Sequence, residues 1–211
     1  EQYRLEHLVA DVLAVADQLG GHRIDLVGHD WGGAVAWLVA ARHPQRVRTL
    51  TSVSTPHPAV FAATLAGGDQ DQTARSSYIA FFRQQGAAQV LLAGDGAGLR
   101  NLFESSGHPD QRAVEEYMRV LREPGALHAA LHWYRAVSAD DVGDGTDVAV
   151  PTMFVWGDRD LALGRAAAEG SGDHVSGPYR FEVLEGVGHW IPEDVPDRLN
   201  RLLLDHLAAH Q

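Results

Sequence analysis

The stretch HRIDLVGHDWGG, residues 22–33, leads from a short apolar run into a glycine-rich turn. Ile24, Leu26 and Val27 predict a short buried strand. The run that follows, GGAVAWLVAARHP (32–44), is apolar on nearly all sides, which predicts a helix packed against a sheet. A strand, a sharp turn and a helix form a nucleophile elbow, the turn that presents a reactive side chain at the end of a strand. The sequence therefore predicts such an elbow here.

The residue at the tip of this elbow is Asp30, where hydrolases with a G-x-S-x-G motif carry serine. Serine suits attack on acyl carbon, whereas a carboxylate displaces a leaving group from saturated carbon. Epoxides and alkyl halides are therefore the two substrate classes expected. Gly28 and Gly32 are predicted to relieve Cβ clashes in the strained turn, and Gly33 is predicted to let the helix and the strand approach closely.

Strand and helix patterns alternate along much of the chain. Further strands are predicted in VRTLTSVST (47–55), PTMFVWG (151–157) and YRFEVLEG (179–186), and an amphipathic helix in PDRLNRLLLDHLAAH (196–210). This alternation predicts an α/β fold, a parallel sheet with helices on both faces. Residues 1–56 and 147–211 are assigned to that core. Residues 57–146, where helical patterns are separated by glycine-rich loops, are assigned to an inserted helical lid.

The clearest helices of the lid are SSYIAFFRQQ (76–85), HPDQRAVEEYMRVLRE (108–123) and ALHAALHWYRAVS (126–138). The glycines of GDGAG (94–98) lack the strand and the spacing of a dinucleotide-binding loop, so they predict a flexible loop in the lid. His128 and His132 stand four residues apart, but Ala129 occupies the position of the glutamate in an H-E-x-x-H zinc motif. No metal site is therefore predicted.

A nucleophile, an acid and a histidine follow three different predicted strands. Asp30 ends the first strand, Asp160 follows the third in the motif GDRD, and His189 follows the fourth in GVGHW. Ligands of open parallel sheets bind beyond the carboxyl ends of the strands, which is where all three residues fall. We expect Asp30 to form an ester, His189 to activate the water that cleaves it, and Asp160 to orient the imidazole. Within GDRD, Asp158 competes with Asp160 for the last role.

Cleavage of that ester creates an oxyanion at the carbonyl of Asp30, which needs a hydrogen-bond donor. The backbone N–H of Trp31, at the start of the predicted helix, is expected to supply one. The leaving group separates the two substrate classes, because an opening epoxide needs proton donors such as phenols and a departing halide needs N–H donors such as indole. The Trp31 indole could bind a halide or form a wall of the pocket.

Five motifs, in this order, resemble the epoxide hydrolases of the α/β-hydrolase fold. They are GHDWGG (28–33), YIAFFRQQG (78–86), HWYR (132–135), GDRD (157–160) and GHW (188–190), and the resemblance covers the whole chain. It implies this fold, Asp160 as the acid, and two lid tyrosines, Tyr78 and Tyr134, that hydrogen-bond the epoxide oxygen. It also implies addition of water to an epoxide to give a vicinal diol, with no cofactor. A haloalkane dehalogenase with the same triad and an inactive fragment of the fold are the alternatives.

The sequence before Asp30 differs from the pattern of that family. Its members carry an HGxP loop after an earlier strand, which donates a second N–H to the oxyanion, and no HG dipeptide precedes Asp30. We therefore expect an N-terminally truncated chain with a partial sheet that lacks the first strands. The strand at Ile24–Val27 should then expose an unpaired edge.

The composition of the chain excludes several classes of function. Hydrophobic residues make up 45% and charged residues 21%, which is ordinary for a soluble globular protein, and the net charge of −11 argues against a nucleic-acid partner. The chain has no cysteine, which excludes thiolate catalysis and disulfides. No apolar run approaches the roughly 20 residues of a membrane span, so a cytoplasmic location without membrane contact is expected. The expected partners are a small-molecule epoxide, of small or medium size, and water; the oligomeric state is left open, a homodimer included.

Overall fold

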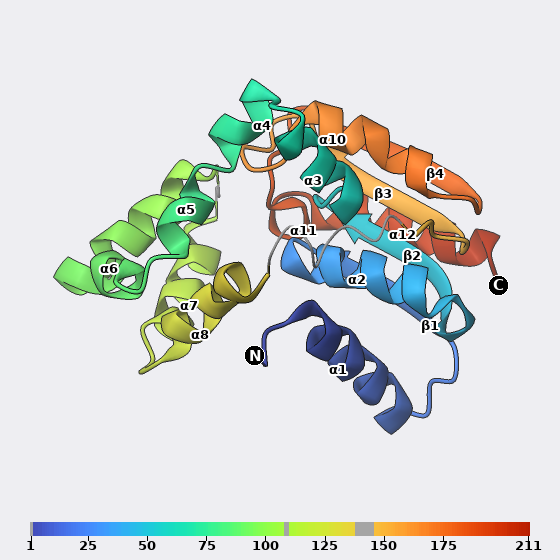
Figure 1. Cartoon of the computed structure of the whole chain (residues 1–211), viewed down its shortest axis with the longest axis horizontal. Coiled ribbons are helices and arrows are strands. Elements are labelled where there is room, and N and C mark those ends of the chain that lie inside the picture. The colour runs from blue at the N-terminus through green and yellow to red at the C-terminus, as the bar shows by residue number, and fades with distance from the viewer. Residues whose placement is uncertain (1, 108–109, 138–145) are drawn as a thin grey trace.

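The computed structural model describes residues 2–107, 110–137 and 146–211 (Figure 1). Four strands form one parallel sheet in the order β1-β2-β3-β4. Their bounds are Ile24–His29 (β1), Val47–Val53 (β2), Thr152–Gly157 (β3) and Tyr179–Leu184 (β4). All four lie where the apolar runs of the sequence predict strands. Because the strands are parallel, their carboxyl ends meet at the same end of the sheet.

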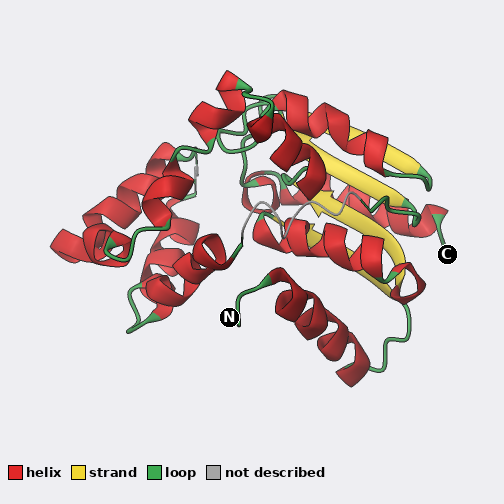
Figure 2. Ribbon diagram, viewed as in Figure 1, coloured by secondary structure: helices red, strands yellow, loops and turns green. Residues whose placement is uncertain are grey.

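Helices cover both faces of the sheet (Figures 1 and 2), which confirms the predicted α/β fold. One face carries α1 (Leu5–Gln18), α2 (Trp31–Arg42) and α10 (Arg165–Gly170), and the other carries α11 (Ile191–Asp194) and α12 (Pro196–Ala209). Two 3-10 helices, η1 (Pro44–Arg46) and η2 (Ser171–His174), lie in the connections. Side chains of β3 alternate between the two cores: Phe154 belongs to the core under α2, and Met153 and Val155 belong to the core over α12. Complete burial of such side chains contributes about 1.5–3 kcal/mol each.

The described part of the segment between β2 and β3 is mainly helical, as predicted. It contains α3 (Pro58–Ala66), α4 (Gln70–Arg75), α5 (Tyr78–Phe82), α6 (Ala87–Ser105), α7 (Gln111–Leu121) and α8 (Ala126–Ala136). Helices α5 to α8 surround an apolar core of their own beside the sheet, in which Leu99 and Met118 are fully buried (Figure 1). Helix α3 instead contacts α10. In the described ranges, no helix has the length and apolar character needed to cross a bilayer.

The division of the chain into a core and a lid at residues 57 and 146 remains a prediction. Residues 108–109 and 138–145 of the predicted lid lie outside the described residues. The helix predicted at 76–85 is limited to α5, because a turn that includes Gly86 separates it from α6. The loop predicted at 94–98 takes the form of a kink within α6, where the backbone of Gly94, Asp95 and Gly96 is left-handed.

Strand β1 is less buried than its apolar run predicts. Val27 is 47% exposed. Among the described strands, β1 pairs only with β2, so one of its edges has no strand beside it. A strand in that position is covered less completely than the central strands β2 and β3, which explains the exposure of Val27.

Two of the three elbow glycines are required for close packing. A Cβ at Gly28 would lie 2.3 Å from the carbonyl oxygen of Gly32, and a Cβ at Gly33 would lie 2.8 Å from the Cβ of Thr55. Neither position accepts a methyl group unless the backbone moves. The prediction for Gly32 itself is wrong, because a Cβ there would meet nothing within 4 Å.

The substitution Gly28→Ala should lower the free energy of unfolding by about 1–3 kcal/mol, the usual cost of forcing a methyl group into a packed site. Gly32→Ala is the matched control. It should be neutral or stabilising by about 0.4–1 kcal/mol, because alanine restricts the unfolded chain without a clash in the folded one. Urea unfolding followed by circular dichroism measures both values, and equal stability of the two variants would contradict the steric argument.

Candidate active site

Asp30 stands between β1 and α2 with a positive φ of 54° and a ψ of −125°. Such a backbone is rare for residues other than glycine and costs about 1–3 kcal/mol. Hydrogen bonds hold it in place: the carbonyl oxygen of Asp30 accepts from Thr55 Oγ1 at 2.8 Å and from the Ala34 N–H at 3.1 Å. The Asp30 side chain is 39% exposed. The elbow therefore presents a carboxylate at the end of the sheet.

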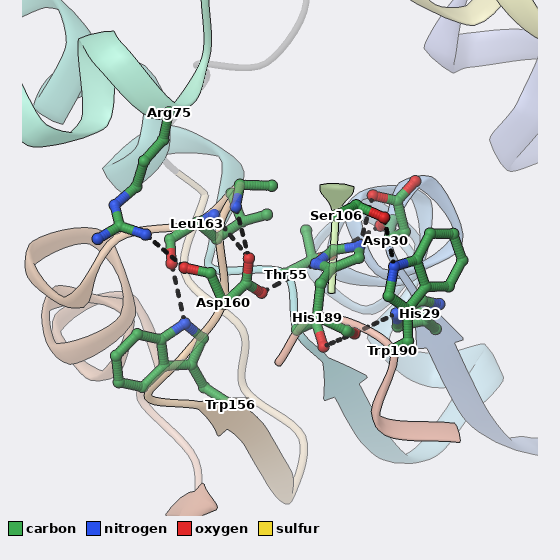
Figure 3. Close-up of polar contacts among 12 residues, drawn as sticks. His29, Asp30, Thr55, Arg75, Ser106, Trp156, Asp160, Leu163, His189 and Trp190 are labelled. Atoms are coloured by element: carbon green, nitrogen blue, oxygen red, sulfur yellow. Dashed lines mark hydrogen bonds and ion pairs between the residues drawn. The ribbon is translucent and has the colours of Figure 1, made fainter. Parts of the chain in front are cut away.

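The three residues predicted to form a triad lie in contact (Figure 3). His189 Nδ1 lies 2.9 Å from Asp160 Oδ2, and His189 Nε2 lies 3.2 Å from Asp30 Oδ1. The imidazole thus bridges two carboxylates that follow β3 and β1. The side chains of Asp160 and His189 are 0% and 9% exposed, so only the Asp30 end of this chain of contacts is open to a ligand.

Asp160, and not Asp158, is the carboxylate that contacts the histidine. Besides the imidazole, Asp160 accepts hydrogen bonds on Oδ1 from the backbone N–H groups of Ala162 (2.7 Å) and Leu163 (2.9 Å). Asp158 accepts from the backbone N–H of Gly186 at 2.7 Å and stabilises the turn after β4. The two aspartates of GDRD therefore make different contacts: Asp160, the one that the family resemblance favours, contacts His189, and Asp158 contacts Gly186.

Electrostatic interactions set the protonation of this site. Burial by itself would lower the pKa of His189, but the hydrogen bonds to Asp160 and Asp30 and their negative charges outweigh it and raise the pKa to about 10. The pKa of Asp30 is below its usual value: burial would raise it, but the hydrogen bond and charge of His189 and the backbone N–H of Trp31 prevail. At neutral pH an ionised Asp30 therefore lies beside a protonated His189.

The two predicted tyrosines lie side by side, Tyr78 on α5 and Tyr134 on α8, with ring centroids 6.1 Å apart. Burial raises the pKa of both hydroxyls, and the negative charge of Asp30 raises it further. Both phenols therefore stay protonated at neutral pH. The Trp31 ring meets the Tyr134 ring edge-on at 5.2 Å, and a hydrogen bond from Trp31 partly offsets the rise in the Tyr134 pKa.

A buried glutamine that the sequence patterns missed holds the loop that carries Asp160. Gln72, on α4, is 1% exposed. Its side-chain amide donates to the Ala162 carbonyl and accepts from the Gly164 N–H, both at 2.8 Å. Arg75, one turn further along the helix, donates to the carbonyl of Asp160 (Figure 3). A polar residue in a short helix gives no sequence signal of such a role.

Two further residues that the sequence patterns missed contact the main chain of the histidine. His29 Nε2 and Ser54 Oγ both lie within hydrogen-bond distance of the carbonyl oxygen of His189. His29 could have been suspected as a polar residue directly before the elbow aspartate; Ser54 offers no comparable signal.

The two histidines considered for a metal site lie on one helix. The rings of His128 and His132 lie 5.4 Å apart on α8. Within the described ranges, no group of three or more histidine, aspartate or glutamate side chains is arranged to hold a metal ion.

Comparison with known proteins agrees with this architecture. The profile of the family described as "alpha/beta hydrolase fold" matches residues 1–196. Epoxide hydrolase 4 of Mus musculus is 31% identical over 212 residues, which cover 96% of this chain and 59% of the mouse protein. The AB hydrolase superfamily protein YfhM of Bacillus subtilis is 31% identical and is covered over 73% of its length, with 98% of this chain aligned.

The fold of the chain is similar to that of solved structures. The crystal structure of an epoxide hydrolase from Bacillus megaterium in complex with an inhibitor superimposes with a TM-score of 0.86 at 24% identity, covering 98% of this chain and 77% of that one. The chain spans about 59% of the length of the mouse relative, so these likenesses concern the part that is shared. On the match of residues 1–196 and the four-stranded parallel sheet, the chain belongs to the α/β-hydrolase fold family.

Proposed function

We propose that the protein is an epoxide hydrolase that converts a small epoxide into a vicinal diol through a covalent ester of Asp30. One observation carries this proposal: a carboxylate at the elbow, in contact with His189, lies close to two protonated phenols, those of Tyr78 and Tyr134. The name of the mouse relative supports the same activity. The cytoplasmic location and any homodimer stay predictions.

In the first step, a carboxylate oxygen of Asp30 attacks a ring carbon of the epoxide. A new carbon–oxygen bond forms, the ring carbon–oxygen bond breaks, and its electron pair stays on the former ring oxygen. That oxygen takes a proton from Tyr78 or Tyr134, which becomes a tyrosinate. A positioned general acid of this kind contributes about 10²–10⁴-fold to a rate.

Formation of the ester changes the charge around His189. Asp30 is then neutral, so one of the two carboxylates that raise the His189 pKa no longer acts on it. The imidazolium returns a proton to the tyrosinate and becomes a neutral base. The nucleophilic step thus prepares the base for the hydrolytic step.

In the second step, His189 takes a proton from a water molecule that attacks the carbonyl carbon of the ester. The backbone N–H of Trp31 stabilises the oxyanion that forms there. Collapse of this intermediate breaks the bond to the alcohol, which takes the proton from His189 and leaves as the diol. The carboxylic acid of Asp30 then gives its proton to His189, and the resting state is restored.

The alternative as a haloalkane dehalogenase has less support. A halide site would need the indole N–H of Trp31, and that side chain is engaged with Tyr134. Release of chloride or bromide from a panel of haloalkanes, without diol formation from epoxides, would establish this alternative in place of the proposed function.

Removal of the Asp30 charge should lower the pKa of His189. In Asp30→Asn, we expect the imidazole to titrate below about 10, because only Asp160 still stabilises the imidazolium by charge. The raised pKa of His189 also means that its ion pair stabilises the fold fully below pH 6.5 and that this contribution is lost as the pH rises through about 10.

NMR titration of the imidazole protons measures the fall of the His189 pKa in Asp30→Asn. Asp158→Asn is the control and should leave the titration unchanged; an unchanged titration in Asp30→Asn would refute the coupling.

Repeated turnover of an epoxide in heavy-oxygen water should place the heavy isotope in the Asp30 carboxylate, because water attacks the ester at its carbonyl carbon. Digestion and mass spectrometry of the peptide around Asp30 measure the label. In His189→Gln the ester should accumulate, and the same peptide should gain the mass of the epoxide. An unlabelled peptide in an enzyme that accumulates diol would exclude the covalent route.

Loss of one phenol should slow epoxide opening. Tyr78→Phe and Tyr134→Phe are each expected to reduce the rate of ester formation by about 10²-fold, in the range observed for loss of a general acid or oxyanion donor. Tyr179→Phe is the matched control, because it removes a buried hydroxyl on β4 that has no hydrogen-bond partner among the described residues. Stopped-flow measurement of ester formation compares the three variants. Equal rates in all of them would remove the tyrosines from the mechanism.

A further inference from the structure

The main-chain carbonyl of His189 accepts two side-chain hydrogen bonds. His29 Nε2 lies 2.9 Å from this oxygen (Figure 3), and Ser54 Oγ lies 2.7 Å from it. A carbonyl oxygen has two lone pairs, so these two donors fill its capacity. His189 belongs to the loop between β4 and α11, where no helix or strand fixes the backbone. The two hydrogen bonds therefore fix the backbone of His189, as main-chain hydrogen bonds do within a helix or a strand.

The donors come from the ends of the two neighbouring strands. His29 is the last residue of β1 and pairs in register with Val53, the last residue of β2; Ser54 follows directly. The backbone of Ser54 has a φ of 60°, which is unusual for serine, and its N–H donates to the Val155 carbonyl at 2.8 Å. Strained residues persist where their surroundings hold them and gather at functional sites. Here the strain aims the Ser54 hydroxyl at the histidine loop.

His29 favours its neutral form, which still donates one hydrogen bond. A carbonyl oxygen can only accept, so Nε2 of His29 carries a hydrogen. Burial lowers the pKa of His29, and the positive charge of His189 lowers it further. The two rings lie 4.9 Å apart. A neutral His29 at that distance donates its hydrogen bond without repelling a protonated His189.

We propose that His29 and Ser54 are positioning residues that hold the backbone of His189 where its ring reaches Asp30 and Asp160 together. The ring must satisfy two contacts at once, 3.2 Å to one carboxylate and 2.9 Å to the other. A displaced carbonyl would tilt the ring away from at least one of them. This inference rests on the proposed function only for its kinetic consequence, since the contacts themselves involve no substrate.

Two substitutions on different strands test the proposal. Ser54→Gly removes the hydroxyl and suits the positive φ, so the folded state should keep its stability. His29→Phe keeps an aromatic ring and removes the donor. Each should slow decay of the Asp30 ester by roughly tenfold to a hundredfold, the scale of loss that a misplacement of about 1 Å causes. Ester formation should change much less, because the nucleophile and the phenols are untouched.

Two control variants separate positioning from general stability. His29→Gln keeps an N–H donor at a similar distance from the backbone and should restore most of the rate of ester decay. Thr49→Val removes an equally buried hydroxyl in the first half of β2, where it donates to Asp25, and should leave ester decay unchanged. Single-turnover kinetics give the rates of ester formation and decay, and urea unfolding gives the stability of each variant.

The NMR titration of His189 provides a readout that needs no substrate. In Ser54→Gly and in His29→Phe its pKa should fall, because the ring loses part of its contact with the carboxylates. Unchanged ester decay and an unchanged titration in both variants would overturn the proposal, as would an equal loss of ester decay in Thr49→Val. If no epoxide forms an ester with the unaltered protein, the proposed function fails, and the titration alone decides whether His29 and Ser54 position the imidazole.

Discussion

The site depends on the strained backbone of Asp30 at the end of β1. An aspartate in regular strand geometry would direct its carboxylate to one face of the sheet, under a layer of helices. The positive φ turns it outward instead, and the chain can return into α2 only because Gly28 has no side chain. Thr55, just beyond β2, holds the carbonyl of the strained residue. The strained backbone of the elbow is thus stabilised by a residue that follows the neighbouring strand, so the elbow depends on the sheet for its conformation.

Local patterns in the sequence are enough to predict the parallel sheet and the helices that cover it. Apolar runs mark the four strands, and the turns after them mark where the candidate site residues lie. Asp30, Asp160 and His189 could be chosen because each follows a strand, and parallel strands bring their carboxyl ends together. The geometry then agrees with that choice, since the imidazole lies between the two carboxylates. Their catalytic roles remain a proposal that these contacts support.

Contacts between a side chain and a distant main chain could not be predicted in this way. Ser54 Oγ and the His189 carbonyl are 135 residues apart in the sequence, and Gln72 and the Ala162 carbonyl are 90 apart. Any residue can supply a main-chain carbonyl, so such pairs leave no spacing or residue type to detect. The error at Gly32 has a related cause, because a Cβ clash depends on which segment returns to that point in space.

The anchoring of α4 on the loop that carries Asp160 limits how far the start of α5 can move from that loop. Tyr78 begins α5 only three residues after Arg75, a span of at most about 11 Å of extended chain. The phenol is therefore tethered to the loop that holds Asp160, and changes in residues 70–78 displace both together. Helices α6 and α7 share their apolar core with α5 and α8. The short link between α4 and α5 keeps the Tyr78 phenol and the loop that carries Asp160 together, whatever ligand the residues of the other helices are selected for.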